Sequence, residues 1–170
     1  MKLILAFIFF FVVFGNIRVA NATTSVPEPV SIEYVLPFAG IMPNHPLYFF
    51  KTIRDTLIEK MITNDIKKAE FYILQADKRL QMSVVLSNGD DEALKEAMRN
   101  DAYMYREKSL LTLQTAQGKN VVIPRYVLEK LLVSTKKHQE VLGSMNVDAS
   151  TVKLLIVKIE ALLTTQADKK

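Results

Sequence analysis

Apolar residues recur at steps of three and four along most of the chain beyond residue 46, which is the period of one face of an α-helix. The clearest stripes are Ile66, Ala69, Ile73, Ala76 and Leu80, then Leu128, Leu131, Thr135, His138 and Leu142, and finally Val152, Leu155, Ile159 and Leu162. No stretch alternates with period two for long. The pattern therefore predicts an all-α fold.

Capping residues and prolines divide this pattern into five helices. The expected ranges are 46–62, 66–87, from 90 or 91 to 117, 124–142, and from 148 towards the end of the chain. Asn44 or His45, Asp65, Asp90 or Asp91, and Asp148 are the candidate N-caps. Pro46 and Pro124 suit the first turn of a helix. We expect an antiparallel bundle of about five helices with short connections, the longer ones spanning about 30 Å.

Glycines follow three of the expected helix ends. Gly89, Gly118 and Gly143 each stand just past a predicted helix. Because glycine adopts the left-handed conformation without a Cβ penalty, we expect these residues to terminate the helices.

The first 22 residues have the features of a secretory signal peptide. Lys2 precedes an unbroken apolar run over residues 3–14, and Ala20-Asn21-Ala22 supplies a small-x-small cleavage site. The alternative is an uncleaved anchor, but Gly15 and Arg18 interrupt the run before the ~20 apolar residues that a span needs. We expect cleavage after Ala22, no membrane span afterwards, and a location in the periplasm, the cell envelope or the medium.

Residues 23–45 differ from the helical domain expected over residues 46–170. Five of the six prolines lie between residues 23 and 46, which predicts an extended segment, with residues 23–30 a disordered leader. Residues 34–50 also hold five aromatic residues, which a disordered linker would not carry. We expect this stretch to strap the end of the bundle; the alternative is a partner-binding lip. The candidate interaction residues are Tyr34, Phe38, Tyr48 and Phe49, together with His138.

Charge and cysteine content exclude several classes of protein. The chain has no cysteine, which excludes disulfides, thiolate metal sites and a cysteine nucleophile. Without Lys2 and Arg18, 20 basic residues face 18 acidic ones, a net charge of +2. That small excess predicts no nucleic-acid partner. Protein is the expected partner, and the sequence leaves the oligomeric state open.

No catalytic, cofactor-binding or metal-binding set emerges from the chemistry-bearing residues. His45 has no second ligand nearby, and Asp90, Asp91 and Glu92 are typical of a helix start. No Gly-x-Ser-x-Gly elbow or glycine-rich phosphate loop occurs. His138 lies on an apolar stripe, which favours a core-edge histidine bonded to a neighbouring helix over a buried switch that charges in mild acid.

Two charged strings lie on the second predicted helix. They are Lys67-Lys68-Ala69-Glu70 and Asp77-Lys78-Arg79. A solvated helix face with weak ion pairs is the favoured interpretation, and a charged docking face is the alternative.

The segment from Tyr34 to Pro43 (YVLPFAGIMP), followed by Asn44 to Lys51 (NHPLYFFK), resembles a family of exported bacterial helical proteins described as domain of unknown function 5667. The resemblance continues through residues 67–70, 75–80 and 137–142. The family pattern usually has proline where this chain has Ala39. The resemblance implies an all-helical fold and an extracytoplasmic bacterial setting, and it implies no catalytic residue.

These observations favour an exported, non-enzymatic helical protein that mediates protein contacts in the bacterial cell envelope. The alternative is a periplasmic-type helical chaperone or stress adaptor that holds unfolded clients. An enzyme would need a constellation of catalytic groups that the sequence does not present.

Overall fold

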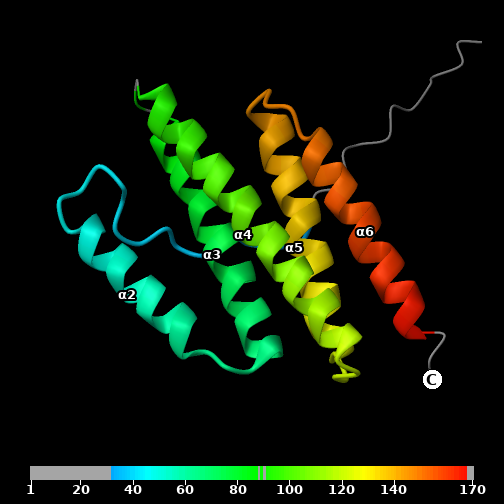
Figure 1. Cartoon of the computed structure of the whole chain (residues 1–170). Helices are drawn as coiled ribbons and strands as arrows, with labels where there is room; N and C mark the ends of the chain where they lie inside the picture. Colours follow the sequence, from blue (N-terminus) through cyan, green and yellow to red (C-terminus); the bar gives the residue numbers. More distant parts are fainter. Residues whose placement is uncertain (1–31, 88, 90, 168–170) are drawn as a thin grey trace, which may run out of the picture. The chain divides into compact units, whose positions relative to one another are not determined.

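The computed structural model describes residues 32–87, 89 and 91–167, which are mostly helical and contain no strand (Figure 1). The helices are α2 (Tyr48–Met61), α3 (Asp65–Leu86), α4 (Glu92–Gly118), α5 (Arg125–Ser144) and α6 (Ser150–Ala167). The all-α prediction is confirmed. The predicted signal peptide and the leader over residues 23–30 lie outside the described residues.

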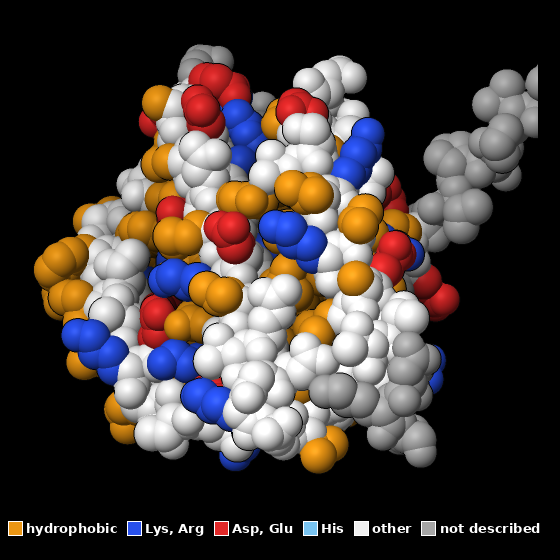
Figure 2. Space-filling view, turned by 45° about the vertical axis from the view of Figure 1, so that its right-hand side comes forward, with side chains coloured by type: hydrophobic (Ala, Val, Ile, Leu, Met, Phe, Trp, Pro, Cys, Tyr) orange, Lys and Arg blue, Asp and Glu red, His pale blue; other side chains and the backbone are white. Residues whose placement is uncertain are grey.

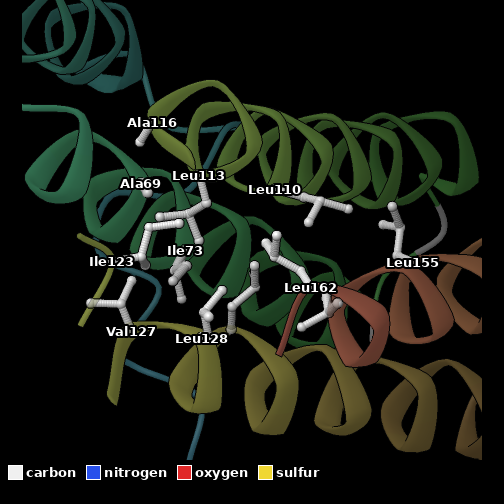
Figure 3. Close-up of a cluster of buried hydrophobic side chains, with 12 residues drawn as sticks. Ala69, Ile73, Leu110, Leu113, Ala116, Ile123, Val127, Leu128, Leu155 and Leu162 are labelled. Carbon is white, nitrogen blue, oxygen red and sulfur yellow. The ribbon is translucent and has the colours of Figure 1, made fainter. Parts of the chain in front are cut away.

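Helices α3 to α6 form a bundle of two hairpins. The α3–α4 pair is the most extensive contact, α5 packs on α6, and α3 also packs on α5. Between the hairpins lies one large apolar cluster (Figure 3). Its buried members are Ala69, Ile73, Leu110, Leu113, Ala116, Ile123, Val127, Leu128, Leu131, Leu155, Ile159 and Leu162. Each buried leucine or isoleucine contributes about 1.5–3 kcal/mol relative to an exposed one.

The three predicted stripes lie on the buried faces of α3, α5 and α6. Apart from Ile66, which is half-buried at the edge of the large cluster, every residue of these stripes is buried. The apolar period therefore located the core correctly.

Helix starts largely match the sequence, with two differences. Asp91 caps α4, its Oδ1 accepting from the Leu94 N–H at 2.9 Å. Asn64, rather than Asp65, caps α3 and accepts from the Lys67 N–H at 3.0 Å. Helix α2 begins at Tyr48, two residues after Pro46, and no side chain caps it.

The predicted role of glycine at the helix ends is wrong for α4 and α5. Gly118 and Gly143 lie within the last turn of their helices, and the left-handed residues are Asn120 (φ 58°) and Asn146 (φ 56°). In both places the N–H of the valine after the asparagine reaches back five residues, at 2.9 and 3.0 Å, which closes a Schellman motif. Asparagine tolerates this conformation, so it ends both helices.

The extended segment over residues 32–47 lies against α3, α4 and α5. Ala39 is buried with Met82 of α3 and Met98 of α4, and Leu36 packs beside Leu142 of α5. The expected packing of residues 34–42 onto the helices is thus found. Helix α2 follows, joined to α3 and α4 mainly through long side chains.

Candidate functional site

A polar cluster inside the bundle is centred on the carboxylate of Asp77 in α3. Its Oδ1 accepts from Arg106 Nη2 of α4 at 2.6 Å and from Ser134 Oγ of α5 at 2.5 Å. His138 Nε2, also of α5, lies 2.8 Å from the same oxygen. The Tyr34 hydroxyl donates to Oδ2 at 2.6 Å. Three helices and the extended segment therefore converge on one carboxylate.

Burial and charge set the protonation of this cluster. Burial raises the pKa of Asp77, but the His138 hydrogen bond and the charge of Arg106 outweigh it and hold that pKa well below its usual range. Burial, aided by the charge of Arg106, lowers the pKa of His138 to about 4. At neutral pH the cluster holds one anion, one cation and a neutral imidazole, so its net charge is zero.

The contacts of the imidazole assign its tautomer. His138 Nε2 touches both the Asp77 carboxylate and the Arg106 guanidinium. A nitrogen that donates to the carboxylate cannot accept from the guanidinium. We assign the proton of the neutral ring to Nε2, because an unprotonated Nε2 would place its lone pair against the Asp77 carboxylate oxygen at 2.8 Å.

Ser134, His138 and Asp77 are the residue types of a nucleophilic triad, but their arrangement differs from one. In a triad the serine faces the histidine ring, which in turn bonds the carboxylate. Here Ser134 donates directly to Asp77, and all three side chains are buried. The arrangement is suited to holding an ion pair in the interior and not to activating a hydroxyl.

The expectation of a solvated face at Asp77-Lys78-Arg79 is wrong for two of the three residues. Asp77 is 1% exposed and Arg79 is 3% exposed. The physical reason is position on the helix, because Asp77 stands four residues after Ile73 and three before Leu80, both in the core. Arg79 lies on the side of α3 that faces α2.

Helix α2 turns its charged side towards the bundle. Lys51 and Asp55 are buried, with Nζ and Oδ2 3.6 Å apart, and the Arg79 guanidinium lies 5.5 Å from the centre of the Tyr48 ring. Burial and the charge of Arg79 lower the pKa of Lys51 to about 8. Among the described residues, Lys51 Nζ, Asp55 Oδ2 and Arg79 Nε find no hydrogen-bond partner. In the Asp77 cluster, Nε and Nη1 of Arg106 likewise lack a partner among the described residues, so both polar regions keep unsatisfied donors.

Further contacts fix the rotation of α2 about its axis. Glu59 accepts from the Tyr72 hydroxyl of α3 at 2.8 Å and lies 3.6 Å from Lys108 of α4. The Tyr48 hydroxyl is 3.8 Å from the sulfur of Met98. Polar contacts at both ends of α2 therefore hold the same side of the helix inward.

The opposite side of α2 is apolar and faces away from the bundle. We call its residues the outer stripe: Phe49, Phe50, Ile53, Leu57 and Met61. Their exposed fractions run from 43% at Ile53 to 80% at Met61. Figure 2 shows hydrophobic side chains gathered at its left edge, the side on which α2 lies in Figure 1. A helix with this orientation has its amphipathicity reversed relative to an ordinary surface helix.

The candidate residues from the sequence separate into two groups. Phe38 is 86% exposed and Phe49 belongs to the outer stripe. Tyr34, Tyr48 and His138 instead point into the fold and hold polar contacts there. The structure thus leaves Phe38 and Phe49 free for contact with another molecule.

Among the other members of the outer stripe, Phe50 belongs to the aromatic stretch over residues 34–50 that the sequence singled out, whereas Ile53, Leu57 and Met61 were not predicted. Phe50, Ile53, Leu57 and Met61 follow one another at steps of three and four, which was a readable signal. That signal marks an apolar face but not the direction in which the face points. The Asp77–Arg106 pair was missed as well, since nothing in the sequence joins two residues 29 positions apart.

A hollow of about 870 Å³ lies between the α4–α5 connection and the ends of α5 and α6. Val121, Leu128, Leu132 and Leu163 are among its apolar walls. Its ionisable groups, Arg125 and Glu129, are exposed and paired with each other at 2.6 Å. Such a pair offers neither a buried base nor an activated nucleophile.

Residues 32–87, 89 and 91–167 contain neither a cluster of metal ligands nor a helix able to span a membrane. No three histidine, aspartate or glutamate side chains in this part of the chain are grouped to hold a metal ion. No helix described there combines the length and the apolar character needed to cross a bilayer.

Comparison of the chain with protein-family models, curated proteins and solved structures finds no match. The resemblance to domain of unknown function 5667 stays a prediction from the sequence. The assignment of function therefore depends on the geometry of the chain itself.

Proposed function

We propose that this protein is an exported, non-enzymatic helical protein that mediates protein contacts in the bacterial cell envelope, and that the outer stripe of α2 is its contact surface. The observation that carries the proposal is the orientation of α2, with Lys51, Asp55 and Glu59 turned inward and the apolar side chains of the outer stripe turned outward. Exposed apolar patches of this kind on soluble proteins mark interaction sites.

The composition of the stripe supports a protein partner. Phenylalanine and methionine are enriched in the cores of protein interfaces, where acidic residues are depleted. No acidic side chain of α2 is exposed, because Asp55 is buried and Glu59 is half-buried against Tyr72. A partner could therefore cover the stripe without burying an unmatched carboxylate.

Two observations support a non-enzymatic role. The Asp77 cluster is buried and its charges neutralise each other inside the bundle. The hollow beside α5 and α6 has no polar group poised for chemistry. The cell-envelope setting follows from the predicted signal peptide and from the family resemblance, and both belong to the proposal.

Site-specific photo-crosslinking in living cells of the host tests the proposal. A photoreactive amino acid replaces Leu57 of the outer stripe, which is 56% exposed. The matched control carries it at Leu154 of α6, which is 55% exposed. We expect discrete protein adducts from position 57 and none of comparable yield from position 154. Equal yields from both positions, or none from position 57, would contradict the proposal.

The same experiment separates the chaperone alternative. A holding chaperone would give many adducts of different size that increase after heat stress, whereas a contact protein gives one or a few. The outer face of a single helix is a convex ridge and not a concave groove. That shape supports the contact protein.

A further inference from the structure

The outer stripe is complementary to itself, and we infer that its partner is a second copy of this chain. The inference rests on the proposed function, since it assigns an occupant to the same surface. Two α2 helices would pack antiparallel about a two-fold axis near residue 55. Ile53 then faces Leu57 of the other copy, and Phe49 faces Met61. An interface of this kind is isologous, with each patch used once by each copy.

The size of the apolar patch suits a dimer. The five stripe residues are large side chains exposed by roughly half to four fifths, which leaves on the order of 600 Å² uncovered. A standard protein interface buries about 800 Å² on each partner. Two copies of the stripe together provide about 1,200 Å², which is the lower end of the range of about 1,200–2,000 Å² that stable interfaces bury in total.

The charges on α2 select the antiparallel arrangement. Arg54 and Lys60 are its exposed cations, and Arg54 donates to Asp55 of its own chain at 2.7 Å. In a parallel pair the two Lys60 ammonium groups would lie next to each other. In the antiparallel pair they are about 15 Å apart along the axis, at a rise of 1.5 Å per residue. Each Lys60 then lies over Phe50 of the other copy, a favourable cation–π position.

The same charges disfavour an anionic membrane as the occupant. Helices that lie in the membrane interface carry several lysines or arginines beside their apolar face. In α2, Lys51 is buried and Arg54 is neutralised by Asp55, so Lys60 is the one exposed cation of this helix without an ion-pair partner among the described residues. One cation provides little attraction to anionic lipid. A second copy of the chain can cover the apolar stripe, and this contact does not require a cluster of positive charges beside it.

The first test is sedimentation equilibrium, in detergent-free buffer, of the purified chain from Thr23 onward, which is the form expected after signal cleavage. We expect the wild type to be a dimer at micromolar concentration. Leu57→Lys places two ammonium groups in the apolar interface and is expected to raise the dissociation constant by more than about 30-fold, the effect of losing a central contact. The matched control, Leu154→Lys, is expected to leave the dimer unchanged.

Disulfide trapping tests the antiparallel arrangement directly. The chain contains no cysteine, so Ile53→Cys and Leu57→Cys each introduce a single thiol. When the two variants are mixed and oxidised, antiparallel packing predicts the mixed disulfide in excess over both symmetric ones. Predominance of the symmetric disulfides would overturn the geometry.

The outcomes separate this inference from the proposed function. A monomeric wild type at about 100 µM whose position 57 still crosslinks to one other protein overturns the dimer and leaves the contact function standing. A monomer without crosslinks overturns both. A monomer that floats with phosphatidylglycerol vesicles, with Leu57→Lys failing to float, overturns the dimer in favour of a membrane.

Discussion

The two faces of the α3–α4 hairpin pack against their neighbours through different kinds of contact, apolar on one face and polar on the other. One face meets α5 and α6 through interlocking apolar stripes, with a single ion pair enclosed among them. The other face meets α2 through lysine, aspartate, glutamate and tyrosine side chains, while the apolar side of α2 is turned away. The same two helices thus support one neighbour by hydrophobic burial and another by polar contacts.

This difference indicates which contacts stabilise the fold and which ones orient α2. Burial of each large apolar residue between the hairpins contributes about 1.5–3 kcal/mol. Buried charges, by contrast, lose hydration nearly as large as the attraction that they gain. The bundle is therefore expected to carry the stability of the fold, and the α2 layer to fix the direction in which the outer stripe points. Four changes test this comparison, from the largest expected effect to the smallest.

Asp77→Ala is the strongest test of the bundle side. It leaves the guanidinium of Arg106 buried without its partner, so we expect the free energy of unfolding to fall by about 3–5 kcal/mol. Urea titration followed by circular dichroism measures the change. The control, Glu107→Ala on the exposed side of α4, should stay within about 0.5 kcal/mol of the wild type. A loss below about 1 kcal/mol for Asp77→Ala would show that the cluster relaxes or admits water.

Lowering the pH is expected to destabilise the fold through protonation of His138 in the same cluster. The pKa of His138 is about 4 in the folded chain, against 6.5 for an ordinary histidine, so the unfolded chain binds the proton first as the pH falls. The contribution of neutral His138 to the free energy of unfolding is fully present above about pH 6.5. About 3 kcal/mol of this contribution is lost by pH 4. Below that pH, protonation of Asp77 adds a second loss, because its folded-state pKa is lowered too.

His138→Gln removes the first of these two acid steps. We expect the stability of this variant to change less between pH 6.5 and 4 than that of the wild type. Urea titrations at several pH values give the difference between the two curves, in which the contribution of carboxylates away from His138 cancels. Parallel curves would exclude His138 as the source of the acid sensitivity.

Tyr34→Phe tests how the extended segment is attached to the bundle. The variant deletes the hydrogen bond to Asp77 Oδ2 and keeps the ring, so we expect a loss of about 1–2 kcal/mol. Limited proteolysis should show faster cleavage within residues 32–47, with the bundle helices still protected. Tyr126→Phe, on an exposed ring of α5, is the matched control. Equal cleavage of the two variants would mean that the apolar contacts of Ala39 and Leu36 suffice.

Lys51→Met tests the α2 side and should have the smallest effect. Burial already lowers the pKa of Lys51 to about 8, and its ammonium group makes no hydrogen bond among the described residues. Because Asp55 keeps Arg54 as a partner at 2.7 Å, replacing Lys51 with an apolar chain of similar length is expected to change the unfolding free energy by less than about 1 kcal/mol. Thermal denaturation at pH 7 measures it. A loss as large as that of Asp77→Ala would remove the distinction between the two faces.

The bundle was predictable from the sequence because its signals are local and redundant. The stripe through Ile73 and Leu80 marks the buried face of α3, and Asp91 marks the start of α4. Each signal needs only the period of a helix or the geometry of a cap. The sequence even placed His138 on the correct face of α5.

Local sequence patterns could not predict the Asp77 cluster or the direction in which the apolar side of α2 points. Asp77 and Arg106 meet because two helices cross, and no pattern within either helix specifies the crossing. Helix α2 shows an amphipathic period, for which the default expectation is an apolar side turned inward. The polar side is instead matched by Arg79, Tyr72 and Lys108, three residues whose joint position exists only after α3 and α4 have packed.

Tyrosines lie both in the Asp77 cluster and between α2 and the bundle, so tyrosine absorbance reports on both polar regions. The sequence has six tyrosines and no tryptophan. Tyr34 lies at the Asp77 carboxylate, while Tyr48 and Tyr72 lie between α2 and the bundle. Half of the tyrosines that dominate the near-ultraviolet absorbance therefore lie at contacts between parts of the fold. Release of α2 would be visible in the unmodified protein as a blue shift of tyrosine absorbance, with no label attached.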